Sequence, residues 1–207
     1  MSTGPAIGSQ PQRVSDELEG WLSGTDEKTL GSLIDLLGER GFAILFVLLL
    51  GVPALPLPTG GATHVFEIIA MLLALESIAG RADIWLPERW RRLELAGAKQ
   101  QRFITGLLKV VRWVERLSRP RLRFLFGHRA SNVVFGLLVI AGSLGAFLAP
   151  PFTGLDTLPA LGVVLLALGV LLEDFLIVIL ALIVMAAGMT LEVVLGTAAF
   201  DTLRTIV

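Results

Sequence analysis

Two side chains that could exchange protons, His64 and Glu67, lie three residues apart inside an apolar stretch of the sequence. A spacing of three places both side chains on one face of a helix. An ionisable group at the centre of a membrane helix costs on the order of 2.5–3.5 kcal/mol, and such groups usually have a function. The pair could therefore bind or pass on a proton near neutral pH. The alternative is that it braces the proline-rich turn before it.

The position of Glu67 along its helix supports a buried site. We expect a helix over residues 62–80, and Glu67 lies 14 residues before Arg81. This separation is about 21 Å at the rise of an α-helix, which is well inside a bilayer. Glu76 lies on the helix face opposite Glu67 and within reach of Arg81. We therefore interpret Glu76 and Arg81 as a structural pair.

Two turns rich in proline, threonine and glycine could complete this site. The unpaired N–H groups at the start of a helix attract anions such as the phosphate of a lipid carrier, although ordinary helix capping explains the same residues. In the second turn, Asp156 could cap the next helix or could face Glu67. Together with His64 and Glu67, the residues that we expect to bind or translocate a solute are Thr59, Gly60, Gly61, Thr153, Gly154 and Asp156.

The composition of the 207-residue chain is that of a membrane protein. Hydrophobic residues make up 54% of the chain and charged residues 17%, whereas about a quarter of a soluble domain is charged. The mean hydropathy is +0.78. The apolar residues gather in two blocks, 41–80 and 130–200, and a helix needs about 20 such residues to cross a bilayer. We therefore predict an all-α, polytopic membrane protein.

Proline and glycine break both apolar blocks into helical hairpins. In the first block the helix should end near Gly51, because Pro53, Pro56 and Pro58 follow it and proline disrupts a helix. The hairpin that results is either re-entrant or fully spanning. In the second block we expect helices over 130–149, 157–172 and 175–199.

The two blocks also resemble each other in sequence. An LLAL string begins at Leu72 and recurs 93 positions later at Leu165. Four further matches at a separation of 94 pair Pro56 with Pro150, Thr59 with Thr153, Gly60 with Gly154 and Thr63 with Thr157. Short matches between apolar segments also arise by chance. If the repeat is real, the broken helices should meet at a central site, as they do in many transporters.

The connector between the blocks, residues 81–129, is strongly basic. It has 13 of the 17 Lys and Arg residues and only 4 acidic residues, so its net charge is +9, whereas residues 1–40 carry −4. The positive-inside rule makes this connector cytoplasmic. A basic amphipathic helix is typical of the surface of an anionic membrane, and nucleic-acid binding is disfavoured because membrane segments flank the patch.

Individual residues of the connector can be assigned to the membrane surface. The apolar face that we expect comprises Phe103, Leu107, Val110, Val111 and Val114. Tryptophans anchor segments at the interface, and cations bind anionic lipids. The membrane-surface residues are Trp85, Trp90, Arg102, Lys109, Arg112, Trp113 and Arg116.

The N-terminal region differs from the rest in being polar. We assign residues 1–24 to a disordered tail, because its beginning is rich in Gly, Pro, Ser and Gln. A single membrane domain follows over 25–200, with the first hairpin at 41–80, the cytoplasmic amphipathic connector at 81–129, and the second hairpin and final helix at 130–200.

A short helix is expected at the start of this domain. Leu30, Leu33, Ile34 and Leu37 have helical spacing. Thr25 or Asp26 could be its N-cap. The helix would lie either at the membrane surface or on the protein.

Motifs for catalysis and for metal or cofactor binding are missing from the sequence. The chain has no cysteine, and its two histidines, His64 and His128, are too far apart for a local metal motif. Walker, G-x-S-x-G and H-E-x-x-H motifs are also missing. We therefore expect a protein that is not an enzyme and that binds no metal and no cofactor.

The string PLPTGGATHVFEIIAMLLALESIAGRADIWLPERW resembles the ExoD family of bacterial membrane proteins, which is linked to exopolysaccharide synthesis. The most specific matches are the turn at 56–61, the Leu-Glu-x-x-x-Gly-Arg motif at 75–81 and Ile-Trp-Leu-Pro at 84–87. The resemblance covers residues 25–200. It implies a role in making, exporting or regulating surface polysaccharide, and it implies no reaction and no catalytic residue.

Two hypotheses for function follow. The first is a multi-pass protein of the bacterial inner (cytoplasmic) membrane that assists exopolysaccharide synthesis by translocating a proton, an ion or a lipid carrier at the broken-helix turns. The second is a non-catalytic scaffold or regulator of polysaccharide machinery that acts through Arg112, Arg116 and Arg119 of the connector. The partners that we expect are a bilayer with anionic lipids and either a second copy of the chain or polysaccharide-synthesis proteins, but no nucleic acid.

Overall fold

The structure, a computed structural model, is helical over almost all of the chain that it describes. The described residues are 14–25, 27–37, 41–55, 63–80, 84, 87–92, 94–95, 97–117, 129–149 and 153–206. Their helices are α1 (Val14–Ser23), α2 (Leu30–Leu37), α3 (Gly41–Leu50), α4 (His64–Ile78), α5 (Glu88–Arg91), α6 (Ala98–Leu117), α7 (Arg129–Leu148), α8 (Thr157–Leu171) and α9 (Phe175–Ile206). One isolated β-bridge joins Thr29 to Glu94. The all-α prediction is confirmed.

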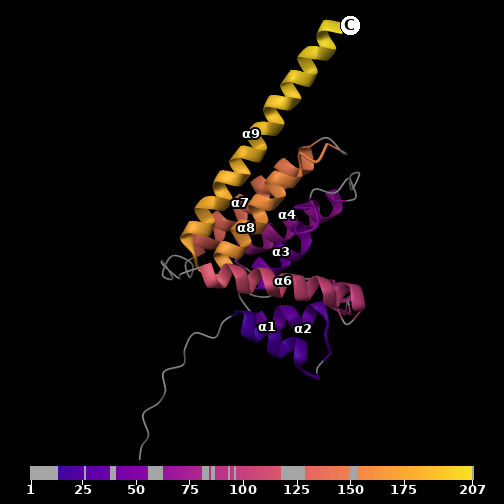
Figure 1. The fold of residues 1–207 in the computed structure, drawn as a ribbon, viewed down its shortest axis with the longest axis vertical. Helices are drawn as coiled ribbons and strands as arrows, with labels where there is room; N and C mark the ends of the chain where they lie inside the picture. Colours follow the sequence, from indigo (N-terminus) through magenta and orange to yellow (C-terminus); the bar gives the residue numbers. More distant parts are fainter. Residues whose placement is uncertain are drawn as a thin grey trace, which may run out of the picture.

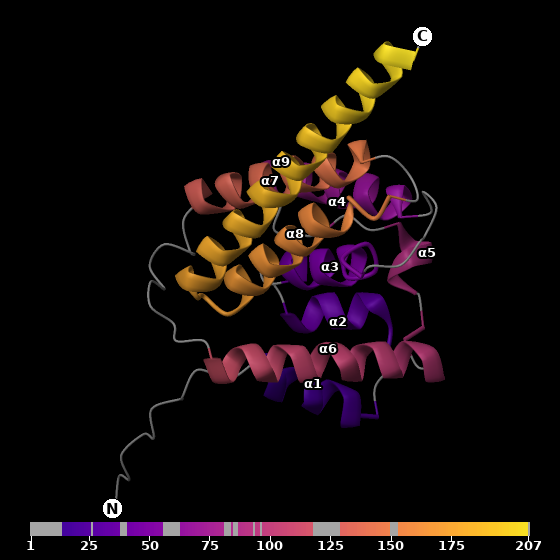
Figure 2. The same ribbon diagram turned by 45° about the horizontal axis from the view of Figure 1, so that its top comes forward.

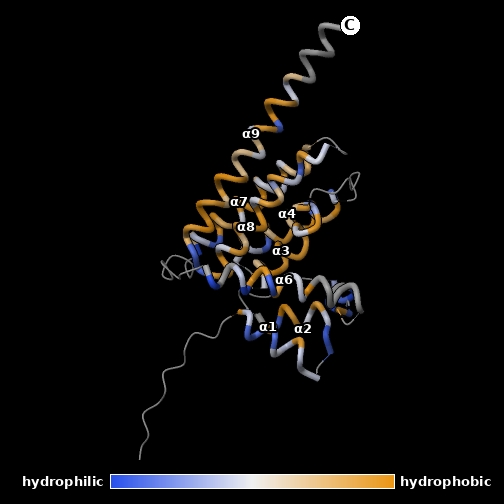
Figure 3. The backbone as a smooth tube through the Cα atoms, viewed as in Figure 1, coloured by the Kyte–Doolittle hydropathy of each residue, from blue (hydrophilic) through white to orange (hydrophobic). Residues whose placement is uncertain are grey.

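Five apolar helices, α3, α4, α7, α8 and α9, pack into a bundle (Figures 1 and 2). Within it, α8 packs on α9 and on α3, and α4 packs on α7 and on α3. Figure 3 shows that hydrophobic residues dominate these five helices, whereas polar residues are frequent in α1 and α6. The helix of the first block ends at Leu50, in agreement with the predicted end near Gly51.

Glycine lets the bundle helices approach one another closely. A Cβ atom at Gly162 of α8 would lie 2.6 Å from the Cβ of Met185 in α9, and one at Gly136 of α7 would lie 3.0 Å from the carbonyl oxygen of Ala74 in α4. Real Cβ atoms essentially never lie within 2.6 Å of another heavy atom, and 3.0 Å is tighter than most real Cβ contacts. Small residues at helix contacts are typical of membrane bundles, where van der Waals packing drives the association of helices.

The outer surface of the bundle is apolar. Helix α7 and the 175–198 part of α9 are long and apolar enough to cross a membrane. Helix α9 extends past the other helices toward the C-terminus (Figure 1). The large hydrophobic side chains that α4, α7 and α9 expose are Val65, Ile68, Leu72, Leu75, Val134, Leu137, Leu144, Leu148, Phe175, Leu176, Ile179, Leu180, Ile183, Leu191, Val193, Val194 and Leu195.

Helices α1, α2 and α6 form a second layer beside the bundle, at the end where α3 begins (Figures 1 and 2). The assignment of residues 1–24 to a disordered tail is wrong for residues 14–23. These residues form α1, which packs on α6 and α2. Leu18 of α1 is completely buried, so apolar contact with the rest of the protein orders this helix.

The buried face of α6 agrees with the expected apolar face at Val111 and differs from it at Val110, while the side chains of Phe103, Leu107 and Val114 lie outside the described part of the chain. Ile104, Leu108 and Val111 are buried, whereas Val110 is exposed. This difference arises because α1 covers the apolar side of α6. The helix therefore uses that face to bind its own chain. Trp113 on the other side remains 65% exposed.

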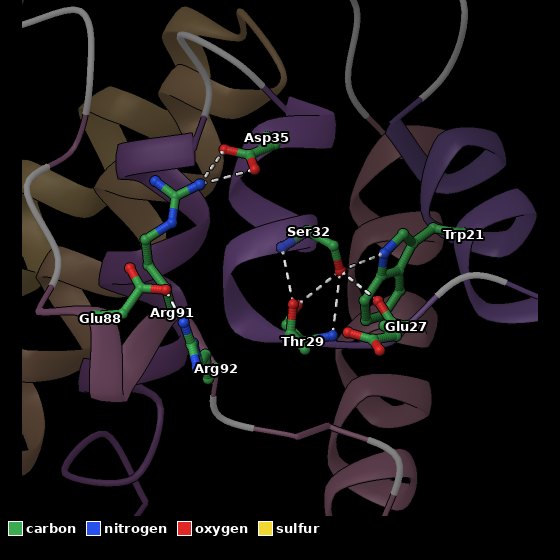
Figure 4. Close-up of polar contacts among 8 residues, drawn as sticks. All are labelled: Trp21, Glu27, Thr29, Ser32, Asp35, Glu88, Arg91 and Arg92. Atoms are coloured by element: carbon green, nitrogen blue, oxygen red, sulfur yellow. Dashed lines mark hydrogen bonds and ion pairs between the residues drawn. The ribbon is translucent and has the colours of Figure 1, made fainter.

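Helix α2 begins with a reciprocal cap formed by Thr29 and Ser32 (Figure 4). The backbone N–H of Ser32 donates to Oγ1 of Thr29 at 3.2 Å, and the backbone N–H of Thr29 donates to Oγ of Ser32 at 3.1 Å. The predicted N-cap at Thr25 or Asp26 is therefore wrong, since the helix starts later. Leu33 is fully buried, so α2 lies on the protein, which was one of the two expected locations.

An ion pair also holds α2 against α5. The guanidinium of Arg91 donates two hydrogen bonds to Asp35, at 2.8 and 3.0 Å (Figure 4). Both hydrogen bonds come from one nitrogen, Nη2, which is shared between the two carboxylate oxygens. Both side chains remain partly exposed, so the pair orients the second layer more than it stabilises it.

Candidate functional site

His64 and Glu67 lie in the first turn of α4 and are hydrogen-bonded to each other. Nδ1 of His64 is 2.8 Å from Oε2 of Glu67. Glu67 is completely buried, whereas 26% of the His64 side chain is exposed. The ring of His64 also lies edge-on to that of Phe147 in α7, with 5.1 Å between the ring centroids. The expectation that both residues share one helix face is confirmed.

The second carboxylate oxygen of Glu67, Oε1, has no hydrogen-bond partner among the residues that the structure describes. The hydroxyl of Ser143 in α7 is also fully buried and has no partner there. A buried polar atom without a partner costs about 1–3 kcal/mol. Such atoms in a native structure call for an explanation, and one explanation is a functional site.

The packing of α4 on α7 places Ser143 level with Glu67. Gly136 of α7 packs against Ala74 of α4, and Phe147, later in α7, contacts His64, which is earlier in α4. The two helices therefore run in opposite directions. Ser143 lies seven residues after Gly136 in α7, and Glu67 lies seven residues before Ala74 in α4. Seven residues are two helical turns, so both side chains point into the shared interface.

Two further carboxylates, Asp156 and Glu192, come from the start of α8 and the middle of α9. Gly188 of α9 packs directly on Leu158 and Pro159 of α8. Glu192 lies one turn beyond Gly188, which brings it to the Asp156 end of α8. Oε1 of Glu192 is buried and has no hydrogen-bond partner among the described residues.

The three carboxylates interact electrostatically. Glu67 is affected by the charges of His64 and Asp156, and Glu192 by those of Asp156 and Glu67. Asp156 occupies the N-cap position of α8, yet its side chain makes no capping hydrogen bond. Of its two predicted roles, capping is therefore wrong, and its interaction with Glu67 is supported.

Other residues predicted for the site have structural roles or lie outside the described residues. Gly154 has a left-handed backbone with φ of 69°, and Oγ1 of Thr153 accepts a hydrogen bond from the N–H of Leu155 at 3.3 Å. Both residues thus shape the turn before α8. Thr59, Gly60, Gly61 and Arg81 lie outside the described residues, so the predicted anion site and the pair of Glu76 with Arg81 remain predictions.

The membrane-surface residues lie mainly on and near α6. Lys109, Trp113 and Arg116 are exposed. Arg112 donates a hydrogen bond to Glu19 of α1, and this ion pair helps to attach α1 to α6. The side chains of Trp85, Trp90 and Arg102 lie outside the described part of the chain.

Sequence reasoning missed Ser143 and Glu192. Glu192 could have been found, because it is an acidic residue inside the apolar segment 175–199, the same signal that identified Glu67. Ser143 has no comparable signal, since serine is common in membrane helices. Ser143 is connected with Glu67 only by its burial and by its position along α7, which is beside that of Glu67 on α4.

The arrangement does not fit a metal centre. Among the residues that the structure describes, no group of three or more His, Cys, Asp or Glu side chains is placed to hold a metal ion. The carboxylates are close enough to affect one another's charge but do not converge on one point.

The fold and the site together define an all-helical protein with ionisable side chains buried between apolar helices. Residues 14–194 match the family described as "Exopolysaccharide synthesis, ExoD". The chain belongs to the ExoD family, as its sequence resemblance indicated, and this family is one of exopolysaccharide synthesis.

Two curated relatives extend over most of the chain. Protein ExoD of Rhizobium meliloti is 32% identical over 200 residues, which cover 94% of this chain and 82% of that protein. An uncharacterized protein of Synechocystis sp. is 28% identical over 187 residues, which cover 89% of this chain and 84% of that protein. No solved structure matches the chain.

Proposed function

We propose that the protein is a multi-pass inner-membrane protein that supports exopolysaccharide production by translocating a small solute through the site around Glu67. The fully buried Glu67, with one oxygen bonded to His64 and the other without a partner among the described residues, is the observation on which this proposal rests. A carboxylate in such surroundings is costly. The family relationship supports the part of the proposal that concerns exopolysaccharide.

The location of the apolar side chains supports membrane insertion. The apolar span in α9 is largely exposed, although its composition is that of a buried helix. Monomeric soluble proteins rarely expose contiguous apolar patches larger than a few hundred Å². A lipid bilayer would cover this surface, together with the exposed apolar residues of α4 and α7.

The arrangement of the hairpins supports two related halves. One half consists of α3 and α4, and the other of α7 and α8. Helix α3 packs on α8, and α7 packs on α4, so the first helix of each half contacts the second helix of the other. Because α4 and α8 both run antiparallel to α7, the two turns lie at the same end of the bundle. The halves would therefore be related by an axis along the membrane normal.

The proposed orientation places the site on the side of the membrane opposite the basic connector. The connector joins the C-terminal end of α4 to the start of α7, and its positive charge keeps it in the cytoplasm. Glu67 lies near the other end of α4. The solute would therefore meet the site from the outer face.

The test uses a strain that lacks the gene and makes less exopolysaccharide. We expect that wild type and Glu88→Gln restore exopolysaccharide output and that Glu67→Gln inserts normally but does not. Glu88 is exposed and pairs only with nearby Arg92 in the described structure, so it controls for the loss of a carboxylate. Full restoration by Glu67→Gln would contradict the proposal.

A membrane scaffold is the second candidate, because α6 keeps an exposed basic and aromatic side. Charge reversal of Lys109 and Arg116 would then abolish exopolysaccharide output, while Glu67→Gln would be tolerated. These two residues are better targets than Arg112, whose reversal would also disturb its bond to Glu19. Recovery of polysaccharide enzymes with wild type, but not with the reversed variant, would favour this candidate over transport.

A further inference from the structure

We propose that the solute at this site is the proton and that Glu192 of α9, with Ser143 of α7, carries it together with Glu67. This inference rests on the proposed function and names its substrate. It adds α7 and α9 to a site that the sequence placed on α4 and on the turns before α4 and α8. The groups involved are Glu67 and His64 on α4, Ser143 on α7, Asp156 before α8 and Glu192 on α9.

The sign of the charge excludes an anionic headgroup at this cluster. Glu67, Asp156 and Glu192 are close enough for their charges to interact, and His64 is the basic side chain hydrogen-bonded to this cluster in the described structure. A phosphate group would be repelled by the carboxylates and would lose its water. Of the solutes considered for the site, a lipid-carrier phosphate therefore does not fit this cluster.

The spacing of the groups favours the proton over a metal cation. A bound cation needs several ligands that converge on one point, and the described carboxylates do not form such a group. A proton needs only one group at a time and passes along a row of groups that differ in protonation. Because like charges repel, protonation of any one carboxylate stabilises the ionised form of its neighbours.

The unpartnered atoms supply the positions between which the proton would move. Oε1 of Glu192, Oε1 of Glu67 and Oγ of Ser143 are buried and lack hydrogen-bond partners among the described residues. Ser143 is not acidic, so its unpartnered hydroxyl is evidence independent of the carboxylates. A hydroxyl both donates and accepts, and it can pass on a proton without becoming charged.

The transfer is a proton movement that needs no redox partner. A proton entering from outside would bind the carboxylate of Glu192 or Asp156 at the mouth of the bundle. It would then move to Oε1 of Glu67, directly or through the hydroxyl of Ser143, which takes one proton and releases another. The proton would then leave Glu67 toward the cytoplasmic end of the bundle. The imidazole of His64, hydrogen-bonded to Oε2 of Glu67, would stabilise the ionised form of Glu67 that remains.

The test measures proton entry into proteoliposomes that hold a pH-sensitive dye, driven by a potassium gradient and valinomycin. We expect wild type and Glu88→Gln to acidify the lumen. Glu67→Gln and Glu192→Gln should each slow the entry by about tenfold or more, and Ser143→Ala by less, because a positioned acid–base group accelerates transfer strongly. Glu192→Asp, which keeps an acid at the same place, should retain most of the rate.

Each remaining outcome separates this inference from the proposed function. Wild-type rates in Glu192→Gln with loss in Glu67→Gln would overturn the role of Glu192 and leave the Glu67 site intact. Flux of sodium, potassium or a labelled lipid carrier without proton flux would overturn the proton but leave translocation standing. Liposomes that move none of these would overturn both. Monodispersity and circular dichroism of each purified variant verify that the variants are folded.

Discussion

Gly80 and Glu173, 93 residues apart, both have a left-handed backbone, with φ of 73° and 54°, and both follow the last turns of matched helices. The hydrogen bonds before them also match, from the N–H of Gly80 to the carbonyl of Ser77 and from that of Glu173 to the carbonyl of Val170. α4 and α8 are both 15 residues long. Both helices thus end in the same left-handed conformation, which is a common way for a helix to end.

This relationship predicts opposite effects of two substitutions on stability. Gly80→Ala should lower the free energy of unfolding by about 1 kcal/mol, because a Cβ strains a left-handed backbone. Steric contact adds little, since the nearest atom to that Cβ, in Arg129, is 3.8 Å away. Glu173→Gly should stabilise the protein by relieving the same strain. Thermal unfolding in detergent measures both, and a stabilising Gly80→Ala would contradict the assignment.

Close packing of α8 on α9 predicts a larger effect at Gly162. In Gly162→Ala the new Cβ would lie 2.8 Å from the Cα of Met185, so the backbones must separate, at a cost of about 1–3 kcal/mol. Gly196→Ala in α9 is the control, because its Cβ meets nothing within 4 Å. This control should be neutral or stabilising by up to about 1 kcal/mol. Equal effects of the two variants in thermal unfolding would argue against the contact.

The proposed topology predicts which single cysteines can be labelled from outside the cell. The natural chain has no cysteine, so each introduced thiol reports on one position only. Leu55→Cys and Thr153→Cys should both react with a membrane-impermeant maleimide in intact spheroplasts, whereas Lys109→Cys should react only after lysis. Labelling of Leu55→Cys and Thr153→Cys from opposite sides would show that the halves are inverted.

The packing of α1 predicts that its buried apolar contact stabilises its attachment to the protein more than its ion pair does. Leu18→Ala should destabilise the attachment by about 2–5 kcal/mol, because Leu18 is fully buried. Glu19→Ala should cost about 1 kcal/mol at most, because the bond from Arg112 is partly exposed to solvent. Hydrogen exchange of α1 in detergent compares the two variants. Faster exchange in Glu19→Ala than in Leu18→Ala would reverse this ranking.

The sequence by itself determined the features that depend on local composition. Prolines end the first apolar helix, three-residue spacing puts His64 and Glu67 on one face, and apolar segments of about 20 residues favour helices. The family motifs could also be recognised from the sequence, because each consists of contiguous residues. These features require no knowledge of distant contacts.

Only the tertiary structure decided which distant groups meet. The register of α4 on α7 brings Ser143 level with Glu67, and the contact of Gly188 with Pro159 brings Glu192 toward Asp156. The same is true of α6, where Ile104 and Leu108 are buried and Val110 is exposed, because α1 covers one side of the helix. Local periodicity shows that a face is apolar. Which helix lies against that face, and at what level, depends on packing between segments far apart in the chain.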